Sequence, residues 1–222
     1  MNARNPAAAP VSAPRASGIV VPIAFAGDDE ALVAALRENH PGAKVAFFHA
    51  YAPYVERLIT RVIGFDRELA DIVQEVFLNA LRSLPSLASA TSLKPWMAQV
   101  SINTARKVLR ARSRRGWLRL FRDPDEALLV QEPAVGVDQD ALRAVRCVYE
   151  VLRELPPDES IAFTLRFVEG MDLTEVAEAC DVSLSTIKRR LGRAERLFLA
   201  VARTRPELDE WLKGGTRWQD TP

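Results

Sequence analysis

The feature that most constrains the fold is a pair of short helical patterns between Asp172 and Arg203, separated by a tight turn. The first pattern has one apolar side, made of Leu173, Val176, Ala177 and Ala179. Thr174 is placed to help cap this helix, residues 181–183 form the break, and Ser183 or Ser185 can cap the second helix. The spacing predicts two helices that meet at a turn.

The second helix combines a buried stripe with a basic face. Apolar residues recur every three or four positions, at Ile187, Leu191, Ala194, Phe198 and Val201. The opposite face carries Ser185, Arg189 and Arg196, flanked by Thr186, Lys188, Arg190 and Arg193. This layout is typical of a helix-turn-helix whose second helix enters the DNA major groove. The alternative is an αα-hairpin with a solvated basic face.

Length and composition limit the remaining choices. A chain of 222 residues, 48% hydrophobic and 27% charged, fits one large or two small soluble domains. It has no run of eighteen apolar residues, and residues 1–27 resemble a disordered tail rather than a signal peptide, so we expect a cytoplasmic protein. Cys147 and Cys180 are too few for a disulfide framework or metal site. His40 and His49 lie near no cluster of ligand or catalytic residues, so we expect no cofactor and no enzyme.

The charges are segregated, although the net charge is only +1. Residues 101–122 contain eight bases and no acid, whereas residues 123–140 contain six acids and no base. Residues 186–205 contain seven bases and one acid. Two basic segments separated by an acidic one predict two DNA-contacting blocks joined by a linker that DNA repels.

Four more helices are expected before this linker. The first runs from a cap at Asp28 to about Asn39, and the second runs from about Lys44 to Ile63, where Gly64 ends it. The buried stripe of the second is Phe48, Tyr51, Val55, Leu58, Ile59 and Val62. The third helix, residues 67–84, carries Asp71, Gln74, Glu75, Leu78 and Arg82 on its outer face. A leucine among acids and amides favours a protein-binding surface, with a lone exposed leucine as the alternative.

The fourth helix opens near Pro95 and is basic on its outer face. That face contains Gln99, Asn103, Arg106, Lys107, Arg110 and Arg114. Amides can read base edges, while arginine and lysine hold phosphates. Trp96 either stacks on a base or fills the core, and the large area that aromatic residues bury favours the core. After the linker, helices are expected over residues 140–154 and 158–168.

Several motifs, in this order, resemble the extracytoplasmic function (ECF) sigma factors of bacterial RNA polymerase. Residues 71–78, DIVQEVFL, resemble the family's region 2.2, and residues 95–106, PWMAQVSINTAR, resemble regions 2.3 and 2.4. Three further segments resemble the family's region 4, namely Leu155-Pro156-Pro157, residues 166–171 (RFVEGM) and the helix-turn-helix. The turn has Asp181 where the family often has glycine, and aspartate tolerates unusual backbone angles better than most residues.

The resemblance implies an all-α protein of two small helical domains joined by a flexible acidic linker. The implied parts are a tail at 1–27, region 2 at 28–118, a linker at 119–139, region 4 at 140–204 and an extension at 205–222. Region 2.2 would make Asp71, Gln74, Glu75 and Leu78 contacts to the clamp helices of the largest polymerase subunit. Region 4 would face the flap of the second-largest subunit, and the linker would follow the RNA-exit path.

The resemblance also assigns DNA contacts. The minus-ten element would be read and melted by Trp96, Gln99, Asn103, Arg106, Lys107 and Arg110, with Asn103 as the main base reader. The minus-thirty-five element would be read by Ser185, Thr186, Lys188, Arg189, Arg190 and Arg193. Core RNA polymerase, promoter DNA and an anti-sigma factor are the implied partners. The alternative is a stand-alone helix-turn-helix regulator that binds DNA as a dimer.

Overall fold

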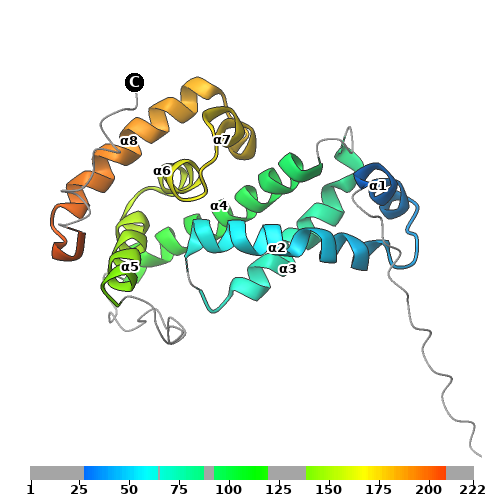
Figure 1. Ribbon diagram of the computed structural model, residues 1–222, viewed down its shortest axis with the longest axis horizontal. Helices are drawn as coiled ribbons and strands as arrows, with labels where there is room; N and C mark the ends of the chain where they lie inside the picture. Colours follow the sequence, from blue (N-terminus) through cyan, green and yellow to red (C-terminus); the bar gives the residue numbers. More distant parts are fainter. Residues whose placement is uncertain (1–27, 65, 88–92, 120–138, 209–222) are drawn as a thin grey trace, which may run out of the picture.

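The residues that the structure describes fold into helices without a strand. The structure is a computed structural model, and it describes residues 28–64, 66–87, 93–119 and 139–208 (Figure 1). The predicted tail, nearly all of the predicted linker and the chain after residue 208 lie outside these residues. Within the described part, no helix has both the length and the apolar content needed to cross a membrane.

The first two helices begin and end where their capping residues predict. α1 (Asp29–Arg37) starts after Asp28, whose carboxylate accepts a hydrogen bond from the Ala31 amide at 3.0 Å. α2 (Ala43–Ile63) ends at Gly64, which has a φ of 85°. The predicted burial of Phe48 is wrong: Phe48 is 42% exposed, and its neighbour Phe47 is 1% exposed. Two adjacent aromatic residues fit a helical stripe almost equally well, and the packing selects the first.

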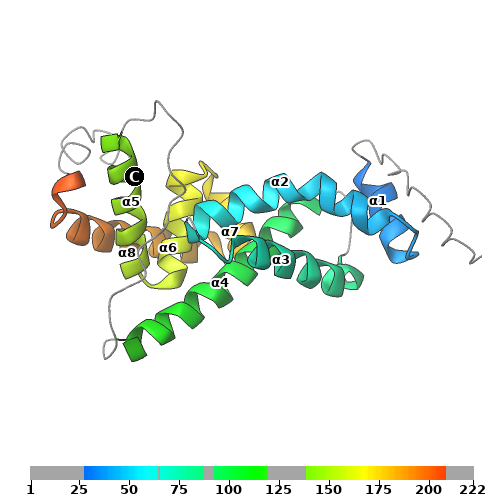
Figure 2. The ribbon, with the colours of Figure 1, turned by 90° about the horizontal axis from the view of Figure 1, so that it is seen from below.

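α3 (Leu69–Ser83) and α4 (Leu93–Arg119) complete the first bundle with α2 (Figure 1). A 3₁₀ turn, η1 (Leu84–Ser86), follows α3. Pro95 lies in the first turn of α4, as predicted. Arg112 of α4 forms ion pairs with Asp66 and Glu68, which precede α3. The C-terminal end of α4 extends away from the bundle (Figure 2).

The second half of the chain contains α5 (Gln139–Glu154), α6 (Pro157–Phe163), α7 (Leu173–Cys180), α8 (Leu184–Ala202) and a 3₁₀ turn, η4 (Pro206–Leu208). The single helix predicted over 158–168 is wrong in its last turn. There, residues Thr164–Val168 form a π-helical turn, η3, and the Glu169 amide donates to the carbonyl of Thr164 at 3.0 Å. This wider turn leads into α7.

The helix-turn-helix is closed by side-chain caps at both helices. Asp172 caps α7 by accepting from the amides of Thr174 and Glu175, and Glu175 accepts from the Asp172 amide in return, which makes a capping box. Thr174 is therefore not the cap that the sequence predicted. Ser183 caps α8, and Asp181 occupies the left-handed conformation with a φ of 55°.

The two predicted domains pack against each other. One hydrophobic cluster joins residues of α1 to α4 with Ile161, Leu165, Val176, Cys180 and Ile187 from the second half. A smaller cluster lies between α5, α6 and the C-terminal half of α8. α4 contacts α6 and α7, and α2 contacts η3; we call these contacts the domain contact (Figure 1). Helical periodicity gave no prediction of this contact.

Candidate nucleic-acid and polymerase interfaces

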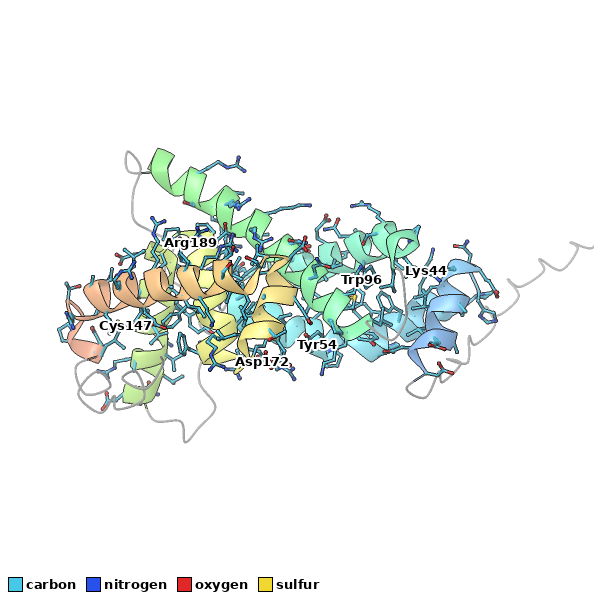
Figure 3. The ribbon with its side chains drawn as sticks, turned by 90° about the horizontal axis from the view of Figure 1, so that it is seen from above. Lys44, Tyr54, Trp96, Cys147, Asp172 and Arg189 are labelled. Atoms are coloured by element: carbon cyan, nitrogen blue, oxygen red, sulfur yellow. The ribbon has the colours of Figure 1, made fainter. Side chains whose placement is uncertain are left out.

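The outer face of α8 is open near its N-terminus. Ser185, Lys188 and Arg189 are exposed, and Arg189 extends from the α8 surface (Figure 3). Thr186 is half-buried, and its hydroxyl lies 2.9 Å from that of Ser183. The Ser183 cap and the buried Ile187 and Leu191 hold this face toward solvent. A DNA strand can reach these side chains without any rearrangement of α8.

Two of the predicted contacts on α8 point instead toward α6. Arg190 Nη2 lies 3.5 Å from Asp158 Oδ2, and Arg193 Nη1 lies 3.3 Å from Glu159 Oε1. The Arg190 side chain is 20% exposed, whereas that of Arg193 is 60% exposed. The six predicted contacts on α8 therefore divide into an open group and a pair of arginines held by carboxylates.

The predicted minus-ten residues lie along α4 and differ in exposure. Lys107 and Arg110 are exposed, whereas Gln99 and Asn103 are half-buried. Trp96 is also partly buried and packs against the main hydrophobic cluster, which agrees with the interpretation of Trp96 as a core residue.

Arg106 is largely enclosed, with a side chain that is 14% exposed. Its guanidinium donates to Asn103 Oδ1 of the same helix and to Asp158 Oδ1 at 2.8 Å. It also donates to the carbonyl of Cys180, at the end of α7, at 3.1 Å. The outer face of α4 therefore meets the second half of the chain at Arg106.

Asp158 is the common acceptor of arginines from α4 and α8. Its carboxylate lies 2.8 Å from Arg106, 2.9 Å from Arg110 and 3.5 Å from Arg190. Burial raises the pKa of Asp158, but the hydrogen bond from Arg110 and the three positive charges outweigh burial and leave the pKa below its usual value. Asp158 is consequently an anion at neutral pH. Sequence reasoning missed Asp158 because its partners lie about fifty residues before it and thirty after it.

The outer face of α3 is open along its length. Asp71, Gln74, Glu75 and Leu78 are all exposed, with Leu78 at 40%. Glu75 lies 3.7 Å from Arg82 of the same helix. The exposed Phe48 of α2 packs its ring against Phe77, with 4.8 Å between centroids. Phe48, which the sequence prediction had placed in the core, is thus an exposed apolar group packed against α3.

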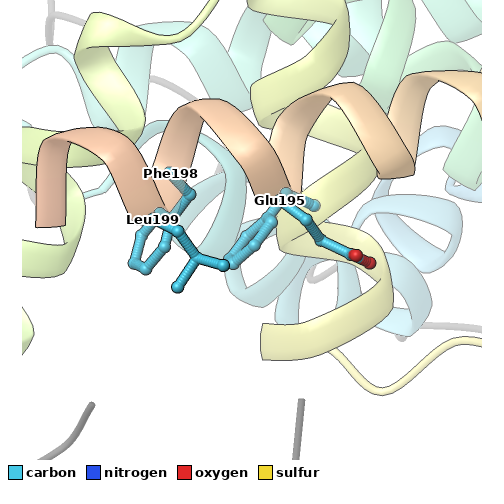
Figure 4. Close-up of a pocket in the computed structure, with 4 residues that line it drawn as sticks. Glu195, Phe198 and Leu199 are labelled. Carbon is cyan, nitrogen blue, oxygen red and sulfur yellow. The ribbon is translucent and has the colours of Figure 1, made fainter. Parts of the chain in front are cut away.

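A small pocket lies between α6 and α8, and its lining is mostly apolar (Figure 4). Phe163, Phe198 and Leu199 line it, with Glu195 at its edge. Burial raises the pKa of Glu195, and the charge of Arg196 partly opposes this effect. One carboxylate among apolar side chains is not an arrangement of paired catalytic groups. In the described residues, no group of three or more His, Cys, Asp or Glu side chains is placed to hold a metal.

Two family models match the chain in order. Sigma-70 region 2 matches residues 47–115, and sigma-70 region 4 matches residues 145–197. The ECF RNA polymerase sigma-E factor of Haemophilus influenzae is 28% identical over 183 residues, covering 77% of this chain and 93% of its own length. The sigma-E factor of Escherichia coli K12 is 26% identical, covering 75% and 90%. The RNA polymerase sigma-H factor of Pseudomonas aeruginosa is 28% identical, covering 75% and 89%.

Two solved structures share the fold at low sequence identity. CnrH, in complex with the cytosolic domain of CnrY, has a TM-score of 0.52 at 18% identity and covers 80% of this chain and 98% of its own. The sigma factor RpoE of Bartonella quintana, in complex with the anti-sigma factor NepR, has a TM-score of 0.52 at 19% identity, covering 71% and 95%.

An all-helical fold with these two regions in this order defines a promoter-recognition protein of the sigma-70 class. The chain belongs to the extracytoplasmic function (ECF) family of RNA polymerase sigma factors.

Proposed function

We propose that this chain binds core RNA polymerase and directs promoter recognition, DNA melting and transcription initiation, by binding and without chemistry of its own. The observation that carries the proposal is the match to regions 2 and 4 in order, with an exposed face on α3 and another on α8. Because its partner would be RNA polymerase, we place its action in the cytoplasm.

Region 4, residues 140–204, would read the minus-thirty-five element with α8. The exposed face of α8 contains Ser185, Lys188 and Arg189, and the half-buried Thr186 lies beside them. Arg190 and Arg193 would join them once phosphate replaces Asp158 and Glu159 as their acceptor. Arginine forms strong, two-pronged hydrogen bonds with carboxylates and phosphates alike, which makes this exchange chemically simple.

Region 2, residues 28–118, would bind and open the minus-ten element with α4. Asn103 would read a base, Gln99 and the part of Trp96 that is not buried would line the site, and Arg106, Lys107 and Arg110 would hold the strand backbone. Unstacking a base costs a few kcal/mol, so only a base that fits the site offsets the cost. The half-buried setting of Gln99 and Asn103 supports a site that reads bases rather than phosphates alone.

The face of α3 would dock on the clamp helices of the largest polymerase subunit. Leu78 supplies an apolar anchor, and Asp71, Gln74 and Glu75 supply a polar rim that suits a basic partner. Region 4 would meet the flap of the second-largest subunit, and the linker at 119–139 would follow the RNA-exit path. An anti-sigma factor is the expected inhibitor. Both solved structures of similar fold are complexes with a second protein, and in one of them that protein is named as an anti-sigma factor, which supports this expectation.

Run-off transcription with core polymerase tests the proposal. Addition of the chain should produce promoter-specific transcripts, and gel filtration of the free chain should give a monomer. A stable dimer that represses transcription would support the alternative of a stand-alone regulator and would overturn the sigma-factor role.

A further inference from the structure

We propose that the free protein holds itself in a closed state, in which region 4 covers Arg106 on the base- and phosphate-binding face of α4. In this state the Asp158 carboxylate takes the place of a DNA phosphate. The inference rests on the proposed DNA-binding role of α4, and it adds a regulatory contact built from this chain alone.

The first argument is chemical. Asp158 accepts from Arg106 and Arg110 of α4 and pairs with Arg190 of α8, so one anion engages arginines from both helices that are proposed to bind DNA. A carboxylate and a phosphate offer arginine the same kind of acceptor. DNA and Asp158 therefore compete for the same guanidinium groups.

The second argument is steric. Arg106 donates both to Asp158 and to the carbonyl of Cys180, and its side chain is 14% exposed. Cys180 and Ile161 belong to the hydrophobic cluster that also contains Ile102 and Ala105 of α4. A nucleic-acid strand reaches the Arg106 guanidinium only after α6 and α7 move away from α4.

A second ionic contact fastens the domains at a site that is proposed to bind neither DNA nor polymerase. Glu169 lies 3.1 Å from Arg57 and 3.9 Å from Arg61, both on α2, and its side chain is 11% exposed. Glu169 directly follows the π-helical turn η3. This contact allows the closed state to be perturbed without touching a proposed DNA contact.

The energetic consequence is a reduced apparent affinity for DNA. When only a fraction of molecules is open, the apparent dissociation constant rises in inverse proportion to that fraction. A DNA phosphate can replace the Asp158 carboxylate as the acceptor of the same arginines, because arginine binds both groups in the same way. The shared hydrophobic cluster must separate as well, so opening requires the binding free energy of promoter DNA and polymerase.

The test compares full-length variants by small-angle X-ray scattering and by binding of a fluorescein-labelled single-stranded oligonucleotide. Glu169→Arg places a third positive charge beside Arg57 and Arg61 and should raise the radius of gyration. It should also strengthen oligonucleotide binding roughly 5-fold or more, the lower end of typical coupling between sites. The double variant Arg57→Glu/Glu169→Arg should restore the closed dimensions and the weaker binding.

Glu154→Arg is the matched control, because it makes the same change of net charge. Glu154, in region 4, pairs at 2.9 Å with Arg205, the residue that directly follows region 4, away from the domain contact. If Glu169→Arg changes neither the dimensions nor the affinity beyond the effect of Glu154→Arg, the closed state is refuted while the proposed sigma-factor role stands. If Glu169→Arg opens the protein and no variant, the wild type included, binds the oligonucleotide, the DNA-binding role of α4 is refuted instead. Circular dichroism verifies that each variant is folded.

Discussion

A β-carbon on Gly64 would lie 3.1 Å from Cδ1 of Tyr149, so the end of α2 approaches the ring of a residue on α5 more closely than most β-carbons allow. Gly64 also has a φ of 85° and a ψ of −170°, a backbone conformation that is open almost exclusively to glycine. One position thus ends a helix and permits contact between the two halves of the chain.

We expect Gly64→Ala to lower the free energy of unfolding by about 1–3 kcal/mol, because the substitution adds both backbone strain and a close contact. Urea denaturation measures this loss. Gly170→Ala is the matched control, since Gly170 has a φ of 81° but nothing within 4 Å of its added β-carbon. Equal losses in the two variants would mean that the ring of Tyr149 moves aside without cost.

Arg189→Ala should weaken binding to the minus-thirty-five element by about 1–3 kcal/mol and relax its sequence preference, as loss of a base-reading arginine does. Fluorescence anisotropy with holoenzyme and promoter duplexes measures both effects. Arg203→Ala removes an equal charge just after the end of α8 and should preserve the preference. Unchanged preference in Arg189→Ala would place base reading elsewhere on α8.

Leu78→Glu should prevent assembly with core polymerase, because a charge would replace the exposed apolar anchor of the α3 face. Truncation of such an anchor typically costs about 2 kcal/mol or more. Co-purification with core polymerase provides the measurement. Val45→Glu is the control, since Val45 on α2 is similarly exposed, at 49%, and has no proposed polymerase contact. Normal assembly of the Leu78 variant would remove this surface from the proposal.

Asn103→Ala should spare binding to duplex promoter DNA but impair strand opening, because the proposed role of Asn103 is to hold an unstacked base. Permanganate footprinting reports the opening. A template with a pre-melted minus-ten element should restore initiation, since it removes the unstacking cost. Wild-type permanganate reactivity on duplex promoter DNA would argue against base reading by Asn103.

Cys147 and Cys180 should react slowly with a disulfide reagent in the folded protein. Burial is the main cause that raises the pKa of both thiols, and for Cys180 the charges of Arg106 and Arg190 oppose it only partly. The raised pKa keeps both thiols protonated at neutral pH, so the rate should rise as the pH increases. Both thiols should react promptly in urea. Rapid labelling of the folded protein near pH 7 would contradict this expectation.

The local features of the fold were predictable from the sequence. Short-range rules locate the cap at Asp28, the end of α2 at Gly64 and the unusual backbone at Asp181, because each depends on a few neighbouring residues. They limit the cap of α8 to Ser183 or Ser185, and the structure selects Ser183. The outer faces of α3 and α8 follow from periodicity for the same reason. Periodicity failed at Phe47 and Phe48, where both positions fit the stripe and tertiary packing selects one.

The contacts between the domains were not predictable in this way. Arg106 and Asp158 are separated by 52 positions, and no helical pattern links them. On α4 alone, Arg106 looks like a residue of an open basic face, and only the packing of α6 and α7 encloses it. The division of the α8 residues into an open group and a carboxylate-bound pair has the same origin.

The π-helical turn at Thr164–Val168 orients the chain that follows it through the number of residues in the turn, not through a side-chain contact. In an α-helix each residue turns the chain by about 100°. Removal of the one extra residue in η3 would therefore rotate everything after it by roughly that angle and carry Glu169 away from Arg57. The direction in which the helix-turn-helix faces is thus fixed by a single inserted residue, so a one-residue deletion there would alter its orientation more than any substitution in the same turn.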